Sequence, residues 1–307
     1  MNSNCSTVSI VEVGPRDGLQ NEPAIIDLEV KLSLIERLID SGIKRIEAGA
    51  FVHPVKVPQM ADSDLLFQRL PQNPEVRYSA LVPNLKGLER AIPLPVNEIA
   101  VFAAASEEFS RKNLNASIDE SMQKFREVIK ASLAHRMPVR GYISCALGCP
   151  FEGDIDPQVV AALAKDLFQY GCHEVCLADT IGIGTTTATE KLLNACRKQG
   201  LSFPRLATHF HDTYGQALAN SKTALDMGIR TFDAAVGGLG GCPFAPGATG
   251  NLATEDLVYM LEGSGFSTGI NLEKLAKAGE HITAEIGRTN GSRAGSALNR
   301  KSPTGKC

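Results

Sequence analysis

The sequence predicts a (β/α)8 barrel, the TIM barrel, on three observations. Short Val/Ile-rich runs alternate with amphipathic stretches for most of the length. Eight such runs can be counted, each followed by a helix-like segment, and no composition break or long linker separates them. An open, doubly wound sheet is the alternative, but the turn after the first strand, GPRDG at 14–18, lacks the dinucleotide fingerprint of such sheets.

The expected strands share β-branched, apolar composition and a length of a few residues. In chain order they are 6–13, 45–48, 76–82, 98–103, 139–146, 174–178, 206–211 and 231–236. The clearest helices have apolar residues at helical spacing and are expected at 27–40, 117–134, 157–170, 187–198 and 216–227. Glycine follows several of them, as at Gly42, Gly171 and Gly228, which is typical of a helix end.

The whole chain, 1–307, is expected to be one catalytic domain, with the barrel spanning about 6–250. Two further helices are predicted in the region 251–286, at 254–262 and 271–286. The last segment, 293–307, is rich in Gly, Ser and Lys, and we expect it to be a mobile tail.

Composition excludes several classes of function. The chain has 31 Lys+Arg and 34 Asp+Glu, a net charge of −3, so it lacks the basic excess that binds a phosphate backbone. No run of 18 apolar residues is present, which argues against a membrane span. The N-terminus has neither the basic nor the apolar region of a targeting peptide, so we expect a cytoplasmic protein acting on a small molecule.

The eight cysteines do not indicate disulfides or a zinc site. They are spread over 307 residues without a Cys-x-x-Cys pair. The two Cys-x3-Cys pairs, Cys145/Cys149 and Cys172/Cys176, lie in strand-like apolar stretches, where cysteine is usually a small buried hydrophobe.

The residues at the carboxyl ends of the predicted strands are chemically rich, and in such a barrel they converge on one mouth. They are Glu12, Arg16, Asp17, Gln20, Glu47, Tyr142, Asp179, Thr180, His209, His211 and Asp212. His209 and His211, two residues apart on a strand, point the same way. Together with oxygens from Asp17 and Asn251 they suit a divalent cation, Mg²⁺ or Mn²⁺ first, Co²⁺ or Zn²⁺ as alternatives. Two hydrogen-bonded structural histidines are the competing interpretation.

Two other features have both a chemical and a structural interpretation. Arg16 beside Asp17 is either a surface ion pair or a fixed cation that stabilises oxyanion charge. Residues 237–251 hold six glycines and two prolines in 15 residues, and form either a linker or a lid. The thiol of Cys242 in this segment is the one cysteine for which we expect an acid/base role.

Several segments of the sequence resemble the 3-hydroxy-3-methylglutaryl-CoA lyases, of the metal-dependent aldol/Claisen lyase barrels. They are 11–22 (VEVGPRDGLQNE), 141–153 (GYISCALGCPFEG), 178–185 (ADTIGIGT), 209–220 (HFHDTYGQALAN) and 237–261. The resemblance runs in order from about 7 to 286. GPRDGLQNE together with GGLGGCPFAPGATGN separates these lyases from the related synthases and aldolases, which share the Arg-Asp turn and the His-x-His strand.

The resemblance implies a fold, an activity and a set of site residues. The activity is cleavage of 3-hydroxy-3-methylglutaryl-CoA (HMG-CoA) to acetyl-CoA and acetoacetate, as in leucine degradation, by a homodimer. Residues implied by the resemblance are Asp17, His209, His211 and Asn251 for the metal; Arg16 for the enolate; Cys242 as the mobile acid/base; Glu47, Asp179 and Tyr142 around the reacting centre; Gln20, Asn113 and Thr180 near the acyl group; and Glu255 behind the loop. Either Asp17 or His209 is expected to be the general base.

Three other functions remain open on the sequence alone. Ala50 and His53 replace serines of the better-known lyases, which would permit a bulkier 3-hydroxy-3-alkylglutaryl-CoA. A condensing synthase would use the same mouth with an additional 2-oxo acid site. A barrel that binds metal without catalysis is disfavoured, because every implied catalytic position is filled.

Overall fold

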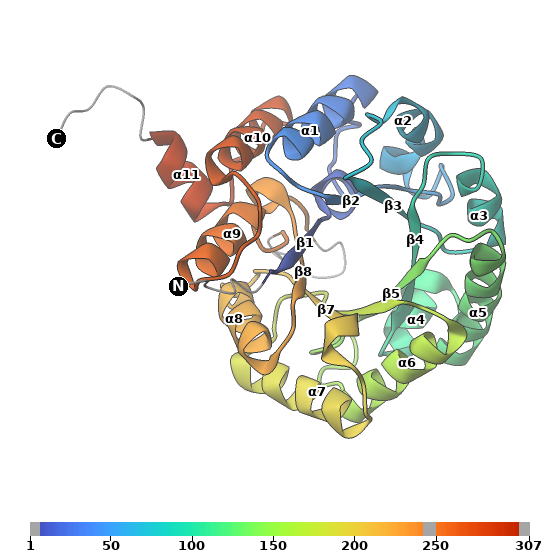
Figure 1. Cartoon of the computed structure of the whole chain (residues 1–307). Coiled ribbons are helices and arrows are strands. Elements are labelled where there is room, and N and C mark those ends of the chain that lie inside the picture. The colour runs from blue at the N-terminus through green and yellow to red at the C-terminus, as the bar shows by residue number, and fades with distance from the viewer. Residues whose placement is uncertain (1–6, 242–249, 301–307) are drawn as a thin grey trace.

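A computed structural model describes residues 7–241 and 250–300 of the chain. Eight parallel strands close into a barrel in the order β1-β2-β3-β4-β5-β6-β7-β8, and helices surround it (Figure 1). The (β/α)8 prediction is confirmed. No helix in these two ranges is long and apolar enough to cross a membrane.

The strands are short and each overlaps a predicted run, with ends that differ by up to three residues. They are β1 Ser9–Glu12, β2 Arg45–Ala50, β3 Arg77–Leu81, β4 Glu98–Ala104, β5 Val139–Ser144, β6 Glu174–Asp179, β7 Leu206–Phe210 and β8 Thr231–Ala234. The helices are α1 Leu28–Asp40, α2 Ser63–Arg69, α3 Leu85–Ala91, α4 Glu107–Leu114, α5 Ile118–Ala134, α6 Pro157–Tyr170, α7 Thr186–Lys198, α8 Ala217–Met227, α9 Thr254–Gly263, α10 Leu272–Glu285 and α11 Arg293–Arg300.

Local sequence signals explain where the long helices begin and end. Ser117 and Glu120 form a reciprocal capping box at the start of α5, which satisfies two otherwise unpaired backbone donors. Gly171 and Gly228 end α6 and α8 with φ of 115° and 114°, a left-handed conformation that costs other residues energy.

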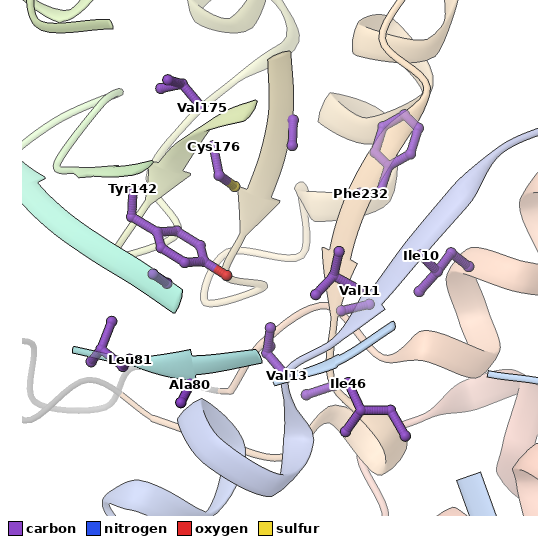
Figure 2. Close-up of a cluster of buried hydrophobic side chains, with 14 of the residues drawn as sticks. Ile10, Val11, Val13, Ile46, Ala80, Leu81, Tyr142, Val175, Cys176 and Phe232 are labelled. Carbon is purple, nitrogen blue, oxygen red and sulfur yellow. The ribbon is translucent and has the colours of Figure 1, made fainter. Parts of the chain in front are cut away.

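The side chains of each strand alternate between the barrel interior and the helical layer. Val11, Tyr142 and Cys176 point inward, whereas Ile10, Val175 and Phe232 point outward (Figure 2). The outward residues pack with the helices into the main hydrophobic core. The interior is different, because charged side chains fill a large part of it.

An ionic cluster occupies the barrel interior below the mouth. Arg140 of β5 donates from Nε to Glu174 Oε1 of β6 at 2.6 Å and is only 1% exposed. Arg45 of β2 donates to the same Glu174 Oε1 at 2.8 Å. Burial alone would raise the pKa of Glu174, but Arg140 and Arg45 lower it to about 2.

This pairing predicts how stability depends on Glu174. Because Glu174→Gln leaves the buried Arg140 and the partly buried Arg45 without their shared carboxylate, we expect it to lower the free energy of unfolding by about 3 kcal/mol at pH 7. The folded pKa of Glu174 lies below its ordinary value of 4.5, so this stabilisation is complete above pH 4.5 and is lost as the pH falls toward 2. Urea unfolding of the wild-type and Glu174→Gln proteins should therefore show a difference in the free energy of unfolding that becomes smaller as the pH is lowered. A difference that does not change with pH would show that the Glu174 carboxylate is not stabilised by these two arginines.

The prediction that the last segment, 293–307, is a mobile tail was wrong for part of its length. Residues 293–300 form helix α11, which packs on α10 and α9. The start of α11 is held by Asp256 of α9, whose carboxylate accepts hydrogen bonds from Ser292 Oγ at 2.8 Å and Ala294 N at 2.6 Å. A carboxylate stabilises a helix N-terminus, because it accepts hydrogen bonds from the unpaired backbone N–H groups there. Residues 293–300 therefore form a helix although their composition is typical of a tail.

Candidate metal centre

Asp17, His209 and His211 meet at the carboxyl end of the barrel. Their ligand atoms all lie within 4.8 Å of one another. The Nε2 atoms of His209 and His211 lie 3.9 and 3.8 Å from Asp17 Oδ2. His209 comes from β7 and His211 follows its end, so the i, i+2 spacing directs both rings into the mouth as predicted.

Asn251 joins this cluster from the chain that follows the glycine-rich segment. It pairs with His211 in an isolated antiparallel bridge, and its Nδ2 donates to Asp17 Oδ2 at 2.9 Å and to Leu239 O at 3.0 Å. Asn251 Oδ1 and His211 Nδ1 are buried and have no hydrogen-bond partner among the described residues. The unpaired, buried Asn251 Oδ1 is an acceptor that a cation would satisfy, and His211 would coordinate through Nε2, the nitrogen that faces Asp17. An Asp, Asn and two His donors suit a divalent ion.

A tight turn presents Arg16 and Asp17 to the site. Residues Gly14–Gly18 form a single π-helical turn directly after β1. A Cβ at Gly14 would lie 2.5 Å from Glu12 Oε1, and one at Gly18 would lie 2.8 Å from Leu239 Cβ. Glycine is therefore required at both ends of the turn by close approach of its neighbours.

Arg16 is a buried cation in a fixed orientation. Its Nε donates to Glu47 Oε1 and its Nη1 donates to Asp17 Oδ1 at 2.7 Å. Glu47 Oε2 accepts from the Tyr142 hydroxyl at 2.8 Å. Nη2 of Arg16 makes no hydrogen bond to any described residue, which leaves one donor for a substrate oxygen. The alternative interpretation of Arg16 and Asp17 as a surface ion pair is excluded, because Arg16 is only 7% exposed.

Charges at the site control its protonation states. Burial alone would raise the pKa of Asp17, but Arg16, His209 and His211 lower it to about 2, so the carboxylate is ionised at neutral pH. Burial and the neighbouring His209 lower the pKa of His211 to about 4, so its ring is neutral and able to coordinate a cation.

The remaining predicted site residues differ in the hydrogen bonds that their side chains make. The carboxylate of Asp179 holds the loop after β6, accepting from Ile183 N at 3.2 Å and Gly184 N at 2.9 Å. Thr180 Oγ1 accepts from Cys145 N at 2.9 Å. Glu255, at the start of α9, accepts from Gly237 N at 2.9 Å, at the base of the glycine-rich segment. Two further residues make no side-chain hydrogen bond within the described chain: Gln20, partly buried, and Asn113, exposed on α4.

Cys242 lies outside the described residues, so its expected acid/base role stays a prediction. The sequence interpretation also missed two residues of the site, Asp233 of β8 and Arg140 of β5. Asp233 contacts His209, Arg140 and Tyr142 from inside the barrel. One feature of the sequence could have identified Asp233. It is an ionisable residue in a mostly apolar strand, and because it is adjacent to the outward-facing Phe232 it must face the barrel interior.

The fold and the site together define a class: a (β/α)8 barrel with a candidate divalent-cation centre at the carboxyl ends of its strands. The HMGL-like family matches residues 7–282, and the chain belongs to this family.

Two relatives and one crystal structure show which members of this family the chain resembles. "Hydroxymethylglutaryl-CoA lyase" of Pseudomonas mevalonii is 52% identical over 295 residues, covering 96% of this chain and 98% of the relative. "3-hydroxy-3-isohexenylglutaryl-CoA/hydroxy-methylglutaryl-CoA lyase" of Pseudomonas aeruginosa is 53% identical, covering 95% and 97%. The crystal structure of hydroxymethylglutaryl-CoA lyase from Pseudomonas aeruginosa superposes with a TM-score of 0.94 at 52% identity, covering 97% and 99%.

Proposed function

We propose that this protein is a lyase that cleaves HMG-CoA to acetyl-CoA and acetoacetate. Identity near 52% over nearly the whole chain to proteins named for that reaction supports it. The single structural observation that carries the proposal is Arg16 beside the Asp17, His209 and His211 cluster, one fixed cation next to one candidate cation site. Incubation with HMG-CoA and Mg²⁺, with acetoacetate measured, tests it.

Asp17, His209, His211 and Asn251 are the residues that would hold the ion, and we propose Mg²⁺ or Mn²⁺. When bound, such an ion lowers the pKa of a coordinated alcohol and orients the substrate. The buried, unpaired Asn251 Oδ1 and the Nε2 atoms of His209 and His211 that face Asp17 Oδ2 support this set.

The protein's own groups account for the proton and charge transfers. Asp17 or His209 takes the proton of the substrate's tertiary 3-hydroxyl group. As that oxygen becomes a ketone, the bond between C2 and C3 breaks, and its electron pair passes to the thioester as an enolate. Arg16 Nη2 is oriented to neutralise the enolate oxygen. Cys242 then donates a proton to C2, which gives acetyl-CoA, and acetoacetate leaves as the second product.

Removal of divalent metal should abolish activity. EDTA-treated protein is expected to be inactive, and added Mg²⁺ or Mn²⁺ to restore turnover, because the substrate alcohol is otherwise a very weak acid. His209→Ala should be far less active than His135→Ala, since His135 is exposed at the end of α5. Full turnover after metal removal would refute the assignment.

The six-carbon methyl substrate should be preferred to longer 3-alkyl chains. One relative is named for both an isohexenyl and a methyl substrate, so the comparison is direct. We expect kcat/KM for HMG-CoA to exceed that for 3-hydroxy-3-isohexenylglutaryl-CoA, because the turn and loop motifs closely resemble those of the 3-hydroxy-3-methylglutaryl-CoA lyases. The reverse order would assign the bulkier substrate. Ala50 and His53 are the first positions to exchange for serine in that case.

A homodimer and a cytoplasmic location are also proposed. Sedimentation of the protein in solution, and fractionation of cells that express it, test these two points.

A further inference from the structure

Asp233 is a buried carboxylate that lies beneath the metal cluster. It is 2% exposed on β8, directly across the β7–β8 ladder from His209. Its Oδ2 lies 3.4 Å from His209 Nδ1, while Nε2 of the same ring faces Asp17 Oδ2 at 3.9 Å. The two nitrogens of His209 therefore face two carboxylates, one below the site and one within it.

The guanidinium group of Arg140 fixes the orientation of the Asp233 carboxylate. Arg140 Nη2 donates to Oδ1 at 2.7 Å, and Arg140 Nη1 donates to Oδ2 at 3.0 Å, the two-point pairing that suits a guanidinium group. The Tyr142 hydroxyl, which has one proton, lies 2.9 Å from Asp233 Oδ2 and 2.8 Å from Glu47 Oε2 and can donate to either. Because Arg140 is itself held by Glu174, Asp233 has little freedom to turn away from the ring.

The contacts form a closed ring through the site. Arg16 contacts Asp17, Asp17 faces His209, and His209 contacts Asp233. Asp233 contacts Tyr142, Tyr142 contacts Glu47, and Glu47 returns to Arg16. The orientation of His209 is thus linked to the orientation of the Arg16 cation.

His211 has no equivalent support. Its Nδ1 is buried and has no hydrogen-bond partner among the described residues. Of the two rings, His209 is the one whose second nitrogen meets a carboxylate, an arrangement that fixes the tautomer and orientation of a ligand.

We propose that Asp233, held by Arg140, is a positioning residue that keeps the Nδ1–H tautomer of His209 and presents its Nε2 to the metal. Both nitrogens of His209 are then engaged, so of the two candidate general bases the proposal leaves Asp17. The proposal rests on the proposed function only for the identity of the reaction. An acceptor at Nδ1 leaves the Nε2 lone pair free, whereas a donor there would place the proton on Nε2 and block coordination.

Asp233→Asn is the substitution that tests this role, because it keeps the size of the side chain. Arg140 would retain the amide oxygen, so the amide NH2 would face His209 Nδ1 and favour the wrong tautomer. We expect Mn²⁺ to bind about 10–100-fold more weakly, the usual cost of losing such a partner. Free Mn²⁺ is measured by its EPR signal, independently of turnover.

Glu174→Gln is the matched control, since it removes the other carboxylate partner of Arg140, and Glu174 makes no hydrogen bond to His209. It should lower the free energy of unfolding but leave the affinity for Mn²⁺ within about threefold of wild type. This change is much smaller than the one expected on losing Asp233, the carboxylate that contacts His209 directly. Equal losses of Mn²⁺ affinity in the two variants would overturn the proposal, because a merely structural network predicts that result. Unchanged affinity in folded Asp233→Asn would overturn it as well.

A second measurement does not depend on whether Asp233→Asn folds. Nitrogen-15 NMR of the metal-free wild-type protein reports the tautomer of each histidine, and His209→Gln identifies the His209 signals. The proposal predicts a proton on Nδ1 of His209, and a proton on Nε2 alone would overturn it. Failure of wild-type protein to cleave HMG-CoA would refute the proposed reaction and leave the Mn²⁺ and NMR results intact, so the two failures are distinguishable.

Discussion

Arg16→Gln is expected to lower kcat by about 10²–10³, the usual cost of removing one donor to a developing oxyanion. Arg16 holds a full charge in a buried position, fixed by Glu47 and Asp17, with Nη2 left for the substrate. Glutamine keeps part of the length and removes the charge, so the enolate forms without neutralisation. Steady-state kinetics with HMG-CoA at saturating Mg²⁺ should show the loss mainly in kcat.

Arg16→Lys separates charge from shape at this position. Lysine retains the charge but cannot make the two directed contacts to Glu47 and Asp17 while also pointing a donor at the substrate. We expect activity between that of the glutamine variant and wild type. Near-normal kcat in Arg16→Gln would show that Arg16 only orders the turn after β1.

Cys242→Ser should lower kcat by roughly 10²–10⁴, the range for a positioned general acid. Serine keeps the shape of the side chain, but its hydroxyl is a weaker acid than a thiol by several pKa units, so protonation of the carbanion should fail while substrate binding survives. The prediction rests on the sequence, where Cys242 lies in a segment rich in glycine and proline. KM is expected to change little.

The other cysteines provide the control for Cys242. Cys145 and Cys196 are fully buried, so replacing either should reduce stability more than rate. Alkylation should inactivate the wild-type protein, and bound substrate should slow the inactivation. A Cys242→Ser protein with near-normal kcat would leave the mechanism without its proton donor.

Local sequence patterns predicted the strands, and the barrel topology that follows from them predicted that Asp17, His209 and His211 would meet. His209 and His211 share one strand end, and Asp17 follows another, so the barrel topology alone brings them together. Arg16 is adjacent to Asp17 in a turn whose glycines mark it in the sequence.

The missed residues depend on contacts across the barrel. Arg140 and Asp233 lie 93 residues apart and come from β5 and β8, which are not neighbours in the sheet. Only closure of the barrel brings their side chains together in its interior. Helix α11 was missed for a similar reason, since the Asp256 carboxylate that caps it lies 38 residues before Ala294.

Cleavage of HMG-CoA by purified protein tests the proposed reaction most directly. With Mg²⁺ present, wild-type protein is predicted to release acetoacetate and acetyl-CoA in equal amounts, and EDTA to stop both. Arg16→Gln and His209→Ala, checked for folding by circular dichroism, should release far less under the same conditions. If folded wild-type protein supplied with Mg²⁺ and HMG-CoA released no acetoacetate, the proposed reaction would be refuted.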